Sequence, residues 1–286
     1  MTSIARLDYA GWPNCYRISN GIADLVVTTD VGPRIIRFGF TGQENEFAEY
    51  AEMAGLTGGG EWRIYGGHRL WVAPEDPPST YAPDNDPVRF EDSDGAVRLT
   101  QPAPGGYAIE KAIEVRLSDD AAEVRVSHTL CNLGPAPVTI APWALSVMAP
   151  GGRATVPLPP RATHGDGHLL PASAIGLWAY TDMTDSRWQW GRDSITLDQD
   201  ARAATPQKAG FAVPDGWCAY DRAGHRFTKR FAYDPGARYP DFGCNVELYT
   251  DARMLELETL GPLCDLQPGG STEHTETWEL RAAEPA

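Results

Sequence analysis

The stretch that decides the fold is Met254-Leu255-Glu256-Leu257-Glu258-Thr259-Leu260-Gly261-Pro262. Its side chains alternate in polarity, and residues two apart in a β-strand share one face. We therefore expect Leu255, Leu257 and Thr259 to face a core, with Glu256 and Glu258 side by side on the opposite face. Bulky apolar neighbours there raise the cost of charge and can tune a carboxyl group for acid–base chemistry. An ordinary strand with a solvated glutamate face is the alternative interpretation.

Similar short runs recur along the chain, separated by Gly, Pro, Asp and Asn. This spacing is typical of an all-β sandwich or barrel, and the 29 glycines and 24 prolines fit a turn-rich β protein. The predicted strands besides the opening stretch are Ile22–Thr29, Pro33–Phe40, Val88–Phe90, Ala96–Gln101, Ala108–Leu117, Ala122–Asn132, Val138–Met148, Arg226–Ala232, Cys244–Thr250 and Thr272–Leu280.

Helical periodicity is weak, and the best candidate for a helix is Glu44–Leu56. Two segments rich in Gly and Pro, Leu56–Asp86 and Arg153–Ser173, are predicted to be irregular, and long loops inside a compact domain are often functional. No polar linker or internal repeat divides the chain. We expect a single domain over residues 1–286, with a frayed tail at 282–286.

The overall amino-acid composition limits the classes of molecule that this protein is expected to bind. The 286 residues carry a formal net charge of −15 with no basic run, so we expect neither nucleic acid nor a membrane as a partner. The sequence has no apolar run of signal-peptide or transmembrane length, and its five cysteines are scattered, which predicts a reduced, cytoplasmic protein. The oligomeric state is not predictable from the sequence.

Motifs for bound cofactors are missing from the sequence. It has no G-x-G-x-x-G after a strand, no Walker loop and no G-x-S-x-G, so we expect no cofactor and disfavour nucleotide-dependent and α/β-hydrolase chemistry. His164 and His168 are four residues apart in a glycine-rich segment, which is a weak metal motif. A divalent ion near the glutamates stays an open alternative.

The segment Trp62–Glu75 concentrates groups that suit a sugar. It contains His68, Arg63, Arg69 and Trp71 around a glycine pair. A sugar packs its C–H face on an aromatic ring and gives its hydroxyls charged partners, and Gly-Gly lets backbone approach a ligand closely. A tryptophan-rich loop packed for stability is the alternative.

A third group of charged residues involves Glu247. If its strand neighbours the opening stretch, Glu247, Glu256 and Glu258 converge, and Lys229 or Arg230 neutralises part of their charge. A solvated charged edge is the alternative.

Several motifs occur in an order that resembles one superfamily. They are Asn20–Val27 and Gly32–Phe38, which look like an opening hairpin, then Gly66–Trp71, Leu257–Thr259 and Leu266–Gly270. In this order they resemble the galactose mutarotase-like (aldose 1-epimerase-like) superfamily, and a bacterial branch of it most closely. The resemblance implies a β-supersandwich of large antiparallel sheets with a concave carbohydrate-binding face and few short helices.

The resemblance also implies catalytic roles. In the enzymes of the superfamily, a glutamate acts as base on the anomeric hydroxyl and a histidine donates to the ring oxygen. Glu258 takes the base position, with Glu256 as the alternative in register. The position of the acid histidine falls at Trp143, so this chain departs from the pattern. We expect His68 to substitute as the acid and Trp143 to stack on a sugar ring.

The expected function is that of an aldose 1-epimerase-like enzyme acting on a mono- or oligosaccharide. The alternatives are a non-catalytic carbohydrate-binding protein and a lyase or hydrolase that acts on an anionic sugar. Beside the catalytic pair Glu258 and His68, the expected substrate-binding residues are Arg69, Trp71, Arg63, Trp143, Glu256, Glu247 and Lys229.

Overall fold

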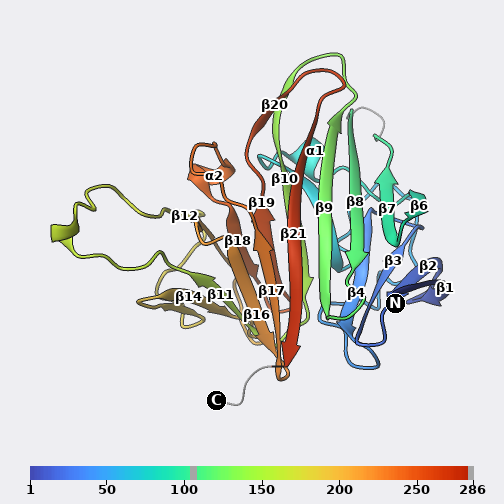
Figure 1. Cartoon of the computed structure of the whole chain (residues 1–286), viewed down its shortest axis with the longest axis horizontal. Helices are drawn as coiled ribbons and strands as arrows, with labels where there is room; N and C mark the ends of the chain where they lie inside the picture. Colours follow the sequence, from blue (N-terminus) through green and yellow to red (C-terminus); the bar gives the residue numbers. More distant parts are fainter. Residues whose placement is uncertain (104–107, 283–286) are drawn as a thin grey trace.

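Two large antiparallel sheets form a β-sandwich in the computed structural model, which describes residues 1–103 and 108–282 (Figure 1). The first sheet contains, in spatial order, β1 (Ser3–Tyr9), β2 (Trp12–Ser19), β3 (Ala23–Thr28), β4 (Arg34–Phe40), β5 (Gly67–Ala73), β10 (Val138–Met148), β19 (Leu255–Leu260), β18 (Val246–Thr250), β15 (Gln207–Phe211) and β12 (Ile175–Leu177), and β20 (Cys264–Leu266) pairs with β10. The all-β class expected from the alternating runs is confirmed.

The second sheet packs against the first (Figure 1). It contains, in spatial order, β13 (Trp188–Trp190), β14 (Ser194–Asp198), β11 (Arg153–Pro157), β16 (Trp217–Arg222), β17 (His225–Phe231), β21 (Ser271–Ala282), β9 (Glu123–Asn132), β8 (Ile109–Leu117), β7 (Ala96–Gln101) and β6 (Arg89–Ser93).

Helical structure in residues 1–103 and 108–282 is limited to short segments. They are α1 (Pro77–Thr80), α2 (Pro240–Gly243) and the 3₁₀ turn η1 (His164–Asp166). No helix among the described residues has the length and apolar character needed to cross a bilayer.

The helix predicted at Glu44–Leu56 is wrong. The first half of the segment pairs with β10, because Phe47 bridges Met148 and the Ala48 N–H donates to the Val147 carbonyl at 2.8 Å. The second half forms turns, in which the Ala54 N–H donates to the Tyr50 carbonyl at 3.0 Å, but no continuous helix. Tertiary pairing thus overrides the weak local periodicity.

The two segments predicted as irregular each contain a strand. β5 and α1 lie within Leu56–Asp86, and β11 begins the segment Arg153–Ser173. Every residue of β5 is buried, so the strand lacks the polar alternation that identifies a half-buried strand. Ala282, the first residue of the expected tail, is the last residue of β21, and residues 283–286 lie outside the described part of the chain.

Aromatic rings join the two sheets in the core. Phe38 of the first sheet contacts Phe227 and Trp278 of the second, with ring centroids 5.9 and 5.8 Å apart. Leu255 and Leu257 of β19 belong to the same core, as their alternation predicts. The face of β19 that carries its glutamates therefore points away from the second sheet.

A buried ion pair lies in the layer between the sheets. The Lys229 ammonium donates to Glu276 Oε1 and to the Leu257 carbonyl, both at 3.0 Å, and neither charged side chain is exposed. Trp278 Nε1 and the Thr259 hydroxyl also donate to Glu276. Burial raises the pKa of Glu276, but the opposing effects, of which the charge of Lys229 is the largest and the Thr259 hydrogen bond is another, lower the pKa to about 2. Lys229, expected beside the site glutamates, is thus a core residue.

Replacing Lys229 with Met should reduce the free energy of unfolding by about 3–5 kcal/mol, because it leaves the Glu276 carboxylate buried without its cation. Chemical denaturation measured by intrinsic fluorescence checks this. Arg230→Met is the matched control, since the next residue on β17 pairs with Glu279 while about half exposed and should cost about 0.2–1 kcal/mol. Equal losses in the two variants would contradict the assignment.

Candidate functional site

Five adjacent strands, β5, β10, β19, β18 and β15, build the floor of the candidate site. Cross-strand pairing aligns their outward side chains in rows. Leu145 of β10 lies opposite Arg69 on one side and Glu258 on the other, and Glu258 lies opposite Glu247 of β18. Three acidic or basic side chains from separate strands therefore share one face.

A cavity of about 540 Å³ lies above this floor, a volume typical of small-molecule sites. Its aromatic lining residues are Tyr50, Trp62, Trp71, Tyr81, Trp143, Trp178, Tyr180 and Tyr249. Its charged lining residues are Arg69, Glu75, Lys208, Asp251, Arg253, Glu256 and Glu258.

Glu258 is fixed through one of its two oxygens. Its Oε2 accepts a hydrogen bond from Trp143 Nε1 at 2.8 Å and one from Lys208 Nζ at 3.3 Å. Its Oε1 is buried and has no hydrogen-bond partner among the described residues. A buried carboxylate oxygen without a donor is costly, so this atom is poised to accept a hydrogen bond from a ligand.

Lys208 is enclosed by carboxylates and indole rings. Its Nζ lies 2.7 Å from Glu247 Oε2 and 4.7 Å from the ring centroids of both Trp143 and Trp178. Burial lowers the pKa of Lys208, but Glu258 and Glu247 outweigh it and hold the pKa above its usual range. Burial also raises the pKa of Glu247 well above that of an ordinary glutamate. Lys208 therefore stays charged in the cavity.

Glu256 is the site carboxyl group that titrates near neutral pH. Burial raises its pKa to about 7, against the opposing effect of Arg69, whose Nη2 donates to Glu256 Oε1 at 2.8 Å. The charge of nearby Glu258 raises the pKa further. The guanidinium of Arg69 also packs over Trp71, 4.3 Å from the ring centroid.

The cavity brings together a majority of the residues expected at the site. The sequence-predicted residues that line it are Glu258, Glu256, Arg69, Trp71 and Trp143. Glu247 contacts Lys208 from beneath, so the expected convergence of three glutamates occurs.

Three expected residues lie elsewhere. Arg63 Nη1 donates to the Gly58 carbonyl at 2.8 Å and the Tyr65 hydroxyl at 3.0 Å, outside the cavity lining. Lys229 lies in the core. His68 also points into the layer between the sheets, because side chains alternate along β5 and its neighbour Arg69 faces the cavity. His68 is therefore not placed to act as an acid in this cavity.

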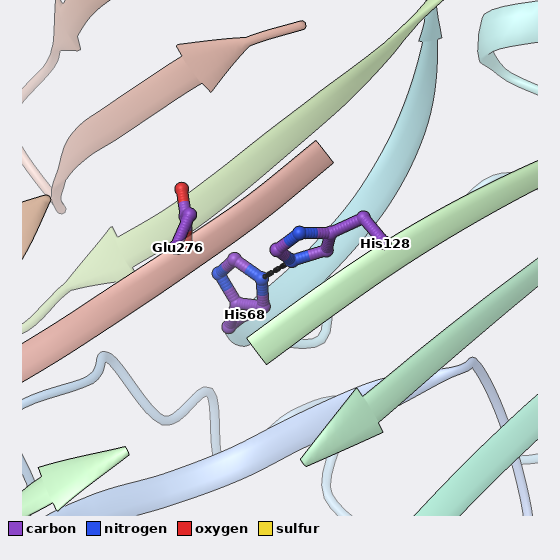
Figure 2. Close-up of side chains that lie close together, drawn as sticks. All are labelled: His68, His128 and Glu276. Carbon is purple, nitrogen blue, oxygen red and sulfur yellow. Dashed lines mark hydrogen bonds between the residues drawn. The ribbon is translucent and has the colours of Figure 1, made fainter. Parts of the chain in front are cut away.

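His68 instead belongs to a hydrogen-bonded chain in the core (Figure 2). Its Nδ1 lies 2.8 Å from Ser146 Oγ and its Nε2 lies 2.6 Å from His128 Nε2. His128 Nδ1 donates to the His274 carbonyl at 2.9 Å, so in neutral His128 the Nε2 accepts from His68. Burial lowers the pKa of both histidines, which favours these neutral forms.

His68, His128 and Glu276 each offer a ligand atom of the kind that binds metal ions. Their ligand atoms all lie within 4.8 Å of one another, and Figure 2 shows the three side chains together. However, Glu276 already accepts hydrogen bonds from Lys229, Thr259 and Trp278. A divalent cation would add charge beside the buried Lys229 ammonium, which is electrostatically unfavourable. The three residues fit a polar core layer better than a cation site.

The glycine pair before His68 serves chain packing. At Gly66 a Cβ atom would lie 2.1 Å from the Ala48 carbonyl oxygen, and at Gly67 it would lie 2.4 Å from that of Ile35. Both glycines also have positive φ angles, 87° and 72°. The close approach expected for a ligand is thus an approach between backbone segments.

Sequence reasoning missed Lys208 as a site residue. It is one of only three lysines in the chain, and it lies in Gln207–Phe211, where every residue is buried. A lysine directly before the apolar run Ala209–Val213 was the available signal, since lysine is almost never fully buried unless it is paired.

Neither a family model nor a curated protein matches the sequence. Solved structures do match. A galactose mutarotase-like protein from Lactobacillus casei has a TM-score of 0.60 at 11% identity, with 94% of this chain and 100% of that chain covered. A candidate aldose 1-epimerase from Klebsiella pneumoniae has a TM-score of 0.62 at 13% identity, with 97% of this chain and 82% of that chain covered. The Slr1438 protein from Synechocystis has a TM-score of 0.60 at 13% identity, with 99% of this chain and 100% of that chain covered. At these identities the likeness shows the fold, which is galactose mutarotase-like as expected.

NMR titration of ¹³C-labelled glutamate carboxyl groups should detect a group with a pKa near 7 that disappears in Glu256→Gln. A second resonance with a raised pKa should disappear in Glu247→Gln instead, because burial raises the pKa of that carboxyl group too. If every glutamate titrated below pH 5, the burial of both carboxyl groups in the cavity floor would be contradicted.

Proposed function

We propose that this protein, which has the galactose mutarotase-like fold, binds a sugar in the cavity and interconverts its anomers, with Glu258 as the base. The observation that carries the proposal is the free Oε1 of Glu258, a buried acceptor on the floor of an aromatic cavity. The names of the structural neighbours, which include galactose mutarotase-like proteins and candidate aldose 1-epimerases, support the same ligand class.

Aromatic side chains provide the sugar-binding surface. Trp71 and Tyr81 pack edge to face at 5.1 Å, and Trp71 and Trp143 do so at 5.3 Å. The C–H face of a pyranose packs on such rings, while its hydroxyls bond to the carboxylates between them. This combination of apolar walls and a few convergent polar groups suits a carbohydrate.

The two glutamates of β19 supply the proton transfers. Glu258 Oε1 removes the proton from the anomeric hydroxyl, the C1–O1 bond becomes a carbonyl, and the bond between C1 and the ring oxygen breaks. Glu256, whose pKa of about 7 leaves it partly protonated at neutral pH, gives its proton to the ring oxygen. Rotation about C1–C2 and reversal of both transfers close the ring as the other anomer, so no proton or electron is gained or lost.

Glu256 takes the acid role that the sequence had suggested for His68. His68 lies in the core, and Trp143, at the position where the resemblance implies the acid histidine, donates its indole N–H to Glu258. An indole N–H donates a hydrogen bond but does not transfer its proton at neutral pH. Trp143 and Lys208 therefore position Glu258 instead of acting as acids.

The replacement of the histidine by Trp143 favours one alternative, a protein that binds a sugar without turnover. Such a protein would use the same cavity, since the aromatic walls and the free carboxylate oxygen serve binding alone. Measurement of anomer exchange separates the two functions.

Glu258→Gln should slow anomer interconversion by about 10²–10⁴-fold, the usual contribution of a general base. Polarimetry and NMR exchange spectroscopy on a panel of aldoses measure the rate. Glu91→Gln is the control, since Glu91 is exposed on β6 of the other sheet and should leave the rate unchanged.

Two results would contradict the proposed catalytic function. An unchanged rate in Glu258→Gln would remove Glu258 as the base. Sugar binding by the wild-type protein with no accelerated exchange for any aldose would identify the non-catalytic alternative.

A further inference from the structure

Each cationic side chain that lines the cavity already has a carboxylate partner. Arg69 pairs with Glu256 at 2.8 Å, and Arg253 pairs with Glu52. Lys208 pairs with Glu247 at 2.7 Å and with Glu258 at 3.3 Å. Among the described residues that line the cavity, every Arg and Lys thus has a carboxylate partner, and the two that are buried, Arg69 and Lys208, are paired with buried carboxyl groups.

Carboxylates outnumber cations around the cavity. Four line it, against three cationic side chains, and Glu247 and Glu52 add two more through their ion pairs. Protonation of the two carboxyl groups with raised pKa values, Glu247 and Glu256, still leaves four carboxylates against three cations. The cavity thus keeps a negative formal charge.

Indole rings cover the two buried cations. The Arg69 guanidinium lies 4.3 Å from the centroid of Trp71, and Lys208 Nζ lies 4.7 Å from those of Trp143 and Trp178. An anionic ligand would have to displace a ring to reach either charge, and it would compete with Glu247 and Glu258 for Lys208 and with ionised Glu256 for Arg69. Breaking one of these buried ion pairs leaves an uncompensated carboxylate, which is strongly unfavourable.

We infer that the cavity selects uncharged and amino sugars and rejects sugars that carry a carboxylate or a phosphate. This inference rests on the proposed sugar-binding function and names its substrate class. The free Oε1 of Glu258 can accept a hydrogen bond from either a hydroxyl or an ammonium group of a sugar. With an ammonium group, attraction between the opposite charges strengthens that hydrogen bond. An anion gains no comparable partner. The segment around Arg69, although it is rich in arginine, therefore does not form a binding site for sugar acids.

Calorimetry with one sugar scaffold in several charge forms tests the inference. The probes are glucose, glucosamine, glucuronate and glucose 6-phosphate, with the galactose set in parallel. Glucuronate and the phosphate should bind at least about tenfold more weakly than the parent sugar, which corresponds to about 1.4 kcal/mol, and the amino sugar at least as tightly as the parent.

A variant that removes the carboxylate partner of Arg69 provides a second test. Glu256→Gln frees the Arg69 guanidinium, so the discrimination against glucuronate should shrink by about tenfold. Glu75→Gln is the matched control. It removes a lining carboxylate that accepts a hydrogen bond from the Tyr81 hydroxyl at 2.5 Å and that forms no ion pair with any of the described residues. It should change the discrimination much less. Thermal denaturation checks that both variants fold. If either variant does not fold, the affinities of the wild-type protein for the four sugar forms still test the inference.

The outcomes separate this inference from the proposed function. If no sugar of any charge binds, the proposed function itself fails. If the wild-type protein binds glucuronate or the phosphate as tightly as the parent sugar, or binds the amino sugar more weakly, the inference is overturned while sugar binding stands. An equal response of Glu256→Gln and Glu75→Gln would show that Arg69 is not the released cation.

Discussion

The ammonium group of Lys208 is the interaction on which the site depends. Glu247 and Glu258 lie directly opposite each other on neighbouring strands, and two buried carboxylates in that arrangement repel. Lys208 lies close to both, and its positive charge offsets the repulsion. Because it contacts Glu258 through one oxygen only, the other oxygen stays available to a ligand. The same contact that allows the glutamates to be buried therefore also leaves one oxygen of Glu258 free to accept a hydrogen bond.

Strand alternation separates the two polar layers of the molecule. One face of the floor carries the cavity and the opposite face carries the ion pair of Lys229 and Glu276. The Leu257 carbonyl, between the two site glutamates in sequence, accepts a hydrogen bond from Lys229. A backbone held from the core side gives the side chains on the other side a fixed position, which is a requirement for a preorganised site.

The sequence predicted those features that depend on local pattern. The two faces of β19 follow from a period of two, and the order of motifs indicated the fold. Its failures arose from contacts between distant segments. His68 and Arg69 are adjacent in sequence, so they read as one cluster, but β5 points them to opposite faces. Lys208 reaches Glu258 only because β18 and β15 continue the floor beyond β19, a strand order that no local pattern specifies.

The position of β21 bears on how the chain folds during its synthesis. β21 spans residues 271–282, yet it lies in the middle of the second sheet, between β17 and β9 (Figure 1). Until the ribosome has passed this segment, β8 and β9 cannot join β16 and β17, and Lys229 has no Glu276 to pair with. The edge of β9 therefore stays unpaired while about 140 further residues are made, and the edge of β17 stays unpaired for a shorter interval, so open strand edges persist until β21 inserts between them.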